Sequence, residues 1–281
     1  MMLSRAPCPP LQPLVRMLWA SEGAEASTEG GLERVLPTGA MHLVFRLSDS
    51  PLRLLEGGRP QSVGRTVVGG ARASYYVREV SQPVSSVGIQ FHAGAAPLLL
   101  GVPAHTLAER HTALEDVWGP VVAEMRERLR AEHSPHARLA LMEQWLLARL
   151  RQTRGALHPA VELALQRFAA GDGVKDVVDA TGYSHRRFIV LFREAVGLPP
   201  KTYTRVLRFQ DALARLARCP DQSWSDLALD AGYADQPHLH RDFIEFTGLS
   251  PGRYRALRPG NPNHVPIPSG GPVGRSKTFK T

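Results

Sequence analysis

A segment that occurs twice in the second half of this 281-residue chain limits its fold more strongly than any other feature. Residues 176–203 read DVVDATGYSHRRFIVLFREAVGLPPKTY, and residues 226–254 read DLALDAGYADQPHLHRDFIEFTGLSPGRY. Asp176, Gly182 and Tyr183 recur 50 positions later, and Gly197, Pro200 and Tyr203 recur 51 positions later. The extra residue falls in the loop after Tyr233, where an insertion is tolerated. One supersecondary unit is therefore used twice.

Each copy has the pattern of two short helices joined by a tight turn. Apolar residues recur at helical spacing in the first helix of each copy, and a second stripe follows in the next helix. These stripes are Val174, Val177, Val178, Thr181 and then Phe188, Phe192, Ala195 in the first copy, and Trp224, Leu227, Ala228, Ala231 and then Leu239, Phe243, Phe246 in the second. Gly182, Gly197, Gly232 and Gly248 stand where helices end, as left-handed residues often do.

This pattern is the helix-turn-helix signature, in which the outward face of the second helix enters the major groove of DNA. The candidate DNA-binding residues are His185, Arg186, Arg187, Val190 and Arg193 in the first copy, and Gln236, Pro237, His238 and Arg241 in the second, with His240 as a further candidate. Arg can bond guanine, and Gln or His can reach base edges, whereas Val can only touch a thymine methyl. The second copy is therefore the better candidate for hydrogen-bonded base recognition.

The segment between the copies, residues 200–217, is predicted to be a helix of roughly 25 Å at about 1.5 Å per residue. Its apolar face, formed by Val206, Phe209, Leu213 and Leu216, should pack against both units. We expect it to hold the two recognition helices about 34 Å apart, one turn of DNA, so that a single chain contacts two adjacent major-groove segments.

The first half of the chain predicts a different fold. Between residues 31 and 95, short apolar runs separated by Gly, Pro, Asp and Ser indicate strands and a small sandwich or barrel. The clearest runs are His42–Arg46, Arg65–Val68, Ser74–Val77 and Ser86–Phe91. Helical spacing follows in residues 119–132 and 136–152. The apolar stripe of the second helix, Leu139, Met142, Leu146 and Leu150, should pack on the strands, with a dimer seam as the alternative.

These patterns divide the chain into three parts. Residues 1–154 form an α+β domain with a regulatory role, residues 155–258 form an all-α domain with two helix-turn-helix units, and residues 259–281 form a basic tail. The tail is rich in Pro, Gly and Ser, so we expect it to be disordered.

Charge and motif content exclude several classes of protein. The formal net charge of +8 favours acidic partners, double-stranded DNA above all. No apolar run approaches the ~18–20 residues of a membrane span, so we expect no membrane association. We expect the protein to lie in the cytoplasm. Two distant cysteines, Cys8 and Cys219, exclude a disulfide framework. No phosphate-binding loop, dinucleotide fingerprint or nucleophile elbow is present, so we expect neither an enzyme nor a cofactor.

No metal site is predicted either. His238 and His240 face different ways on a helix, and His42, His92, His105 and His111 lack the spacing of a metal-binding set. Tyr75, Tyr76 and Trp118 are candidates for an effector pocket, although aromatic core is the favoured interpretation. The effector-binding residues stay unknown at this stage.

Residues 232–255, GYADQPHLHRDFIEFTGLSPGRYR, resemble the C-terminal signature of the AraC/XylS transcription regulators. The first copy resembles the other half of that domain, so the likeness covers residues 157–258. Residues 33–47, 68–79, 87–107 and 116–119 resemble the N-terminal sensory region of one AraC-type subgroup. In that family, base contacts fall at positions like Arg186, Val190 and Arg241, and Val190 departs from the usual polar residue.

The resemblance implies a bacterial, sequence-specific DNA-binding regulator controlled through its N-terminal domain. It makes RNA polymerase, a small-molecule effector and a second copy of the chain candidate partners. Two other functions stay open from the residues alone: an enzyme acting on a small molecule, and an architectural DNA-binding protein without an effector.

Overall fold

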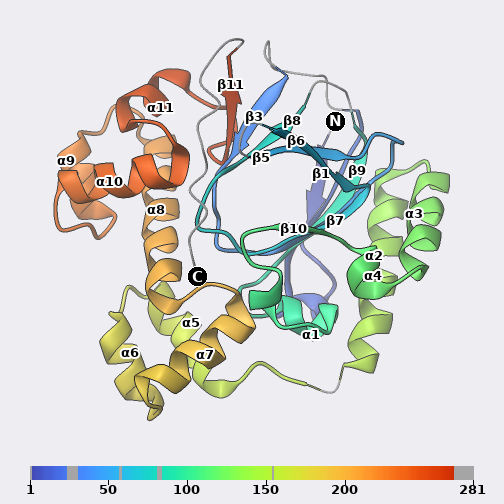
Figure 1. Ribbon diagram of the computed structural model, residues 1–281, viewed down its shortest axis with the longest axis horizontal. Coiled ribbons are helices and arrows are strands. Elements are labelled where there is room, and N and C mark those ends of the chain that lie inside the picture. The colour runs from blue at the N-terminus through green and yellow to red at the C-terminus, as the bar shows by residue number, and fades with distance from the viewer. Residues whose placement is uncertain (1, 24–30, 57–58, 81–83, 154, 269–281) are drawn as a thin grey trace.

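The computed structural model describes residues 2–23, 31–56, 59–80, 84–153 and 155–268. Its N-terminal part is built on two antiparallel β-sheets, and its C-terminal part is helical (Figure 1). The predicted fold class, an α+β domain followed by two helix-turn-helix units, is confirmed.

The first sheet has six strands, and the second has five. In spatial order, the first contains β1 (Met2–Arg5), β2 (Val15–Ser21), β9 (Ser86–Phe91), β4 (His42–Arg46), β7 (Thr66–Gly69) and β10 (His111–Ala113). The second contains β11 (His264–Ile267), β3 (Leu32–Val35), β8 (Tyr76–Glu79), β5 (Leu52–Glu56) and β6 (Arg59–Gly64).

Strand alternation gives each sheet two different faces, because successive side chains point to opposite sides. In β4, Leu43 and Phe45 are fully buried and lie opposite Ile89 and Val87 of β9. His42 and Arg46 point the other way. We call the face that each sheet turns toward the other sheet its inner face, and the opposite face its outer face.

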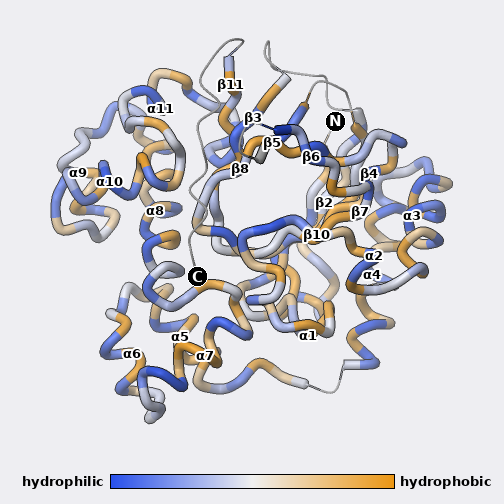
Figure 2. Tube along the Cα trace, in the orientation of Figure 1, coloured by the Kyte–Doolittle hydropathy of each residue, from blue (hydrophilic) through white to orange (hydrophobic). Residues whose placement is uncertain are grey.

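Helices cover the outer face of the first sheet. Short helical turns η1 (Pro9–Leu11), α1 (Ala96–Leu100), η2 (Ala104–Thr106) and α2 (Glu115–Trp118) precede α3 (Val121–Ala131) and α4 (Pro135–Gln152). Leu139, Met142 and Leu146 of α4 are fully buried, and Trp145 lies 6.4 Å from Phe45 between ring centroids. The stripe on α4 therefore packs on the strands, as predicted. Figure 2 shows hydrophilic and hydrophobic residues alternating along these helices.

The helical part contains α5 (Pro159–Ala169), α6 (Val174–Thr181), α7 (His185–Val196), α8 (Pro200–Arg218), α9 (Trp224–Asp230), α10 (Gln236–Thr247) and α11 (Pro251–Leu257). Helix α8 runs from the α6–α7 unit to the α9–α10 unit (Figure 1). Val206, Phe209 and Leu213 on α8 are buried, as the apolar face of residues 200–217 predicts. We call α6–α7 the first unit and α9–α10 the second unit.

The prediction of a disordered tail over residues 259–281 is wrong for the part that the structure describes. Strand β11 pairs with β3 over four residues, from His264 opposite Val35 to Ile267 opposite Leu32. Val265 and Ile267 are buried in the main apolar core. Pairing with a strand remote in sequence supplies the backbone hydrogen bonds, and composition does not reveal such a partner. Residues 269–281 of the predicted tail lie outside the described residues.

Both helix-turn-helix units touch the N-terminal part. A Cβ added at Gly197, which ends α7, would lie 3.2 Å from Ala71. One added at Gly248, which ends α10, would lie 2.8 Å from the ring of Tyr75. The side chain of Gln210 on α8 also donates to the carbonyl oxygen of Pro37 at 2.8 Å. The two parts therefore share a close, glycine-dependent contact in this structure.

Candidate DNA-binding surface

Helix α7 is fixed at both ends by local interactions. The hydroxyl of Ser184 accepts a hydrogen bond from the backbone N–H of Arg187, which caps the helix start. Gly197 ends it in the left-handed region, with φ of 94°. Between them, Phe188 and Phe192 are fully buried. The helix therefore cannot rotate without exposing two aromatic rings, and this sets its outward face.

The candidate residues of the first unit mostly lie on that outward face. His185, Arg186 and Arg187 are exposed, and Val190 keeps 40% of its surface accessible. Arg193 is only half-buried and lies on the flank of the helix. The first unit thus presents Arg186 and Arg187 to solvent beside an apolar Val190.

Helix α10 of the second unit is held in the same way. The carboxylate of Asp235 accepts from the backbone N–H of His238 at 2.7 Å, and Gly248 ends the helix with φ of 68°. Leu239, Phe243 and Phe246 are buried, as predicted. The capping residues differ between the units, but in both units the second helix is capped at its start and turns its apolar side chains inward.

The outward face of α10 carries Gln236, Pro237 and Arg241, which are all exposed. His240 is exposed as well, and Ile244 keeps 44% of its surface accessible. His238 differs, because it is half-buried and its ring lies edge-on to Tyr233 with centroids 5.2 Å apart. The structure therefore turns His238 toward the turn of the unit and places His240 on the solvent side.

The repeat aligns the two faces residue by residue and shows that their arginines occupy different positions. At an offset of 51, Arg241 corresponds to Val190, whereas Arg186 corresponds to Pro237. The first unit therefore offers Arg186 and Arg187 at the start of its second helix, whereas the second unit offers Arg241 near the middle. Two such faces would contact different base positions within their half-sites.

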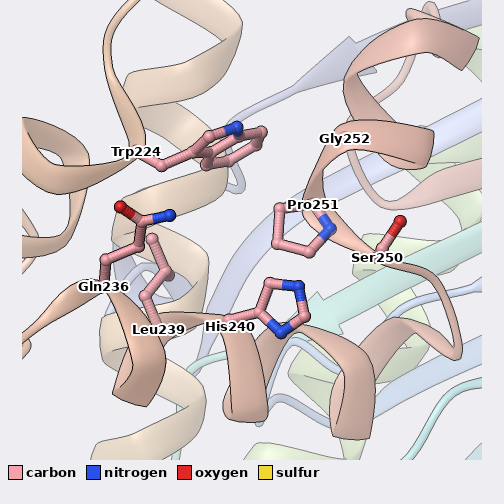
Figure 3. Close-up of a pocket in the computed structure, with 7 residues that line it drawn as sticks. All are labelled: Trp224, Gln236, Leu239, His240, Ser250, Pro251 and Gly252. Atoms are coloured by element: carbon pink, nitrogen blue, oxygen red, sulfur yellow. The ribbon is translucent and has the colours of Figure 1, made fainter.

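A hollow of about 260 Å³ flanks the second recognition helix (Figure 3). It is lined by Trp224, Gln236, Leu239, His240, Ser250, Pro251 and Gly252. The amide oxygen of Gln236 accepts from the hydroxyl of Ser225 at 3.0 Å, which orients its amide nitrogen. The guanidinium of Arg255 covers the Trp224 ring at 3.8 Å. The second unit thus has a concave margin of mixed polar and apolar side chains beside α10.

An ion-pair network fixes α10 on the spacer helix α8. Arg205 donates to Asp242 at 2.6 Å and to Glu245 at 2.7 Å, and Asp242 is only 2% exposed. Burial alone would lower the pKa of Arg205, but the hydrogen bonds that it donates to these carboxylates raise it above its ordinary value. Sequence reasoning missed this network. Its signal was an acidic residue beside Phe243, on the buried side of the predicted helix.

Two other features were sought in the part of the chain that the structure describes, a metal centre and a membrane span. No group of three or more His, Cys, Asp or Glu side chains is arranged to hold a metal ion there. Among the same residues, no helix is both long enough and apolar enough to cross a bilayer.

The fold of the C-terminal part and its two outward faces define a domain of the helix-turn-helix class. In agreement, residues 177–257 match the family described as "Helix-turn-helix domain", and residues 4–113 match a domain of unknown function (DUF6597). The C-terminal part is a helix-turn-helix domain of the AraC type, as the sequence resemblance indicated.

Two similar proteins are named as helix-turn-helix-type transcriptional regulators. An uncharacterized HTH-type transcriptional regulator of Haemophilus influenzae is 30% identical over 115 residues, 41% of this chain and 38% of the relative. The putative HTH-type transcriptional regulator YkgA of Escherichia coli is 34% identical over 82 residues, 29% of this chain and 34% of the relative. The matched segments thus span little more than a third of each relative.

Among solved structures, ToxT from Vibrio cholerae is similar over 92% of this chain and 99% of its own. The TM-score is 0.45 and the sequence identity is 9%, values too low to support an inference about function.

Proposed function

We propose that the chain is a sequence-specific transcription regulator whose two helix-turn-helix units bind adjacent major-groove segments of double-stranded DNA. The observation that carries the proposal is the placement of Arg186 and Arg241. Both are exposed on the outward faces of helices whose opposite faces are buried and whose ends are capped. Exposed arginines at the start or middle of such helices suit bidentate contact with guanine.

In this proposal, residues 155–258 bind DNA and residues 1–154 regulate that binding by taking up a small molecule, without catalysing a reaction. The contacts of Gly197 and Gly248 with the N-terminal part support this division of labour, because a change there would reach both units. Since the target is chromosomal DNA, we place the protein in the bacterial cytoplasm.

Selection of bound DNA from a random pool by the full-length protein tests the proposal. We expect enrichment of a site with two half-sites spaced about one helical turn apart. Binding to the enriched site should weaken steeply as salt concentration rises, because phosphate contacts release counterions. A pool that stays unenriched while the protein is folded would contradict the proposal.

Replacing Arg241 by alanine should cost about 1–3 kcal/mol of binding free energy at the preferred site and relax the choice of one or two base pairs. Titration of the selected duplex and of duplexes changed at single positions measures both effects. Arg151→Ala is the matched control, because this exposed arginine of α4 carries the same charge outside the helix-turn-helix domain. Equal weakening of all duplexes would instead make Arg241 a phosphate contact.

A further inference from the structure

The inner faces of the two sheets do not form an ordinary apolar core. The main core lies on the outer faces and continues into the helical part. Between the sheets, a separate small cluster contains Leu52, Leu54 and Val67, with Val63 and Tyr76 packed against it. Polar side chains lie on the same faces beside this cluster, among them His42, Arg78 and His111.

Those side chains are mainly cationic or aromatic. Arg72 donates to Nδ1 of His111 at 3.0 Å, and its guanidinium lies 5.1 Å from the ring centroid of Tyr76. The ring of His111 in turn contacts Tyr76 and His42, with centroids 4.4 and 5.8 Å apart. The contacts join the two sheets, since Tyr76 belongs to one and both histidines to the other.

One carboxylate of the second sheet faces the same region, and it is already engaged. Glu33 accepts from Arg78 at 3.0 Å and lies 2.5 Å from Nδ1 of His264 on β11. Arg78 is the arginine that pairs with Glu33, and the charges of both Arg72 and Arg78 reach His42 and His111.

Titration directions agree with a positive local potential. Burial, followed by the charges of nearby arginines, lowers the pKa of His42 to about 4. Burial and neighbouring positive charges also lower the pKa of His111 well below its usual value. Arg46 has its pKa lowered to about 10 by burial and by Arg78. Both histidines are therefore neutral near pH 7.

The hydrogen bond from Arg72 fixes which nitrogen of the neutral His111 ring carries the proton. Because a guanidinium can only donate, Nδ1 of His111 accepts and Nε2 carries the hydrogen. Nε2 is buried and has no partner among the residues that the structure describes. A buried N–H donor without an acceptor is costly, so this atom suits an oxygen acceptor supplied by a ligand.

The cluster is also accessible. His42, Tyr76, Arg78 and His111 are half-buried, although protein surrounds them closely enough to shift the pKa of His42, Tyr76 and His111. Side chains that are enclosed and yet keep accessible surface can be reached by a small molecule.

We propose that the inner faces form a binding site for a small organic anion, whose carboxylate or phosphate group lies against Arg72, Arg78 and Nε2–H of His111. The apolar cluster around Leu52 and Leu54 contacts the uncharged part of the ligand. The inference rests on the regulatory role proposed for residues 1–154 and names the chemical class of its ligand.

The same strands carry contacts to the second unit on their outer faces. Tyr75 precedes Tyr76, and it lies against the turn at Gly248 that ends α10. Arg34 follows Glu33, and its guanidinium lies 5.8 Å from the ring centroid of Tyr75. A ligand that shifts Tyr76 would therefore also move its sequence neighbour Tyr75, which touches the end of α10. A shift of Glu33 would reach Tyr75 through the neighbouring Arg34.

Thermal unfolding of the full-length protein tests the site without using DNA. The probes are phenylacetate, succinate and inorganic phosphate, each compared with chloride at equal ionic strength. Phenylacetamide serves as the uncharged counterpart of phenylacetate. At least one anion should raise Tm by about 3 °C or more at about tenfold its Kd, and phenylacetamide should not. No shift with any of the three anions, or equal shifts with phenylacetate and phenylacetamide, would overturn the proposal.

Two variants locate the effect, and one serves as the control. His111→Phe keeps the ring but removes the donor, and Arg72→Gln removes a guanidinium; each should weaken anion binding at least tenfold. Arg53→Gln, which removes an exposed arginine from β5 of the second sheet, should leave binding unchanged. Anion binding equally strong in all three variants would place the ligand elsewhere and refute the site. DNA selection proceeds independently, so its failure would remove the proposed function while anion binding persisted.

Discussion

Replacing Arg205 by leucine is expected to lower the free energy of unfolding by about 3–5 kcal/mol, because it leaves a buried carboxylate without its counter-ion. Asp242 is 2% exposed and receives its hydrogen bonds from Arg205. Glu245, the other partner, is more exposed and can be solvated after the change. Chemical denaturation followed by circular dichroism measures the effect.

A double variant separates the unpaired charge from the lost packing of the arginine stem. Arg205→Leu together with Asp242→Leu removes both charges, so it should recover most of the stability that the single variant loses. A single variant as stable as the wild type would show that the pair does not hold α10 on α8. A double variant no better than the single would assign the loss to packing over Phe246, whose ring lies 5.2 Å from the guanidinium.

The helical half was predictable from sequence because its determinants are local. Stripes such as Phe188 and Phe192 recur at helical spacing, and both capping residues and glycines mark the helix ends. The repeat strengthened the prediction, because two separate segments show the same order of apolar stripes and glycines. Once the buried faces of the second helices were assigned, the opposite faces were the ones predicted to contact DNA.

The strand half was only partly predictable, because pairing partners are remote. The runs His42–Arg46 and Ser86–Phe91 match β4 and β9 residue for residue. Strands β1 and β2 were missed, since the prolines between them mask short extended segments. Strand β11 was missed because its partner, β3, lies more than two hundred residues earlier.

The inner-face cluster shows why separate residues could not be assembled from sequence. The sequence raised His42 and His111 only as metal ligands, and Tyr75, Tyr76 and Trp118 as candidates for an effector pocket or, as the favoured interpretation, aromatic core. In the structure Tyr75 is buried in the main core, as the favoured interpretation held, whereas Tyr76 faces the histidines. Neighbours in sequence thus point to opposite faces, and residues far apart in sequence meet.

Combining Arg186→Ala with Arg241→Ala should cost about 2–6 kcal/mol of binding free energy at the selected site, the sum of two contacts of about 1–3 kcal/mol each. The two residues lie on different units, so their effects should add within about 0.5 kcal/mol if both helices engage DNA together. Titration of one selected duplex with wild type, the two single variants and the double variant measures the four affinities.

The result decides whether the first helix-turn-helix unit contacts bases itself or only supports the second unit. Additive losses, with selectivity relaxed in different half-sites, require both recognition helices to occupy the major groove simultaneously. If Arg186→Ala alone changes nothing, only α10 contacts bases, and Val190 at the position equivalent to Arg241 supplies the reason: its side chain has no group that can hydrogen-bond a base edge. The spacer helix α8 would then position one reading unit rather than two.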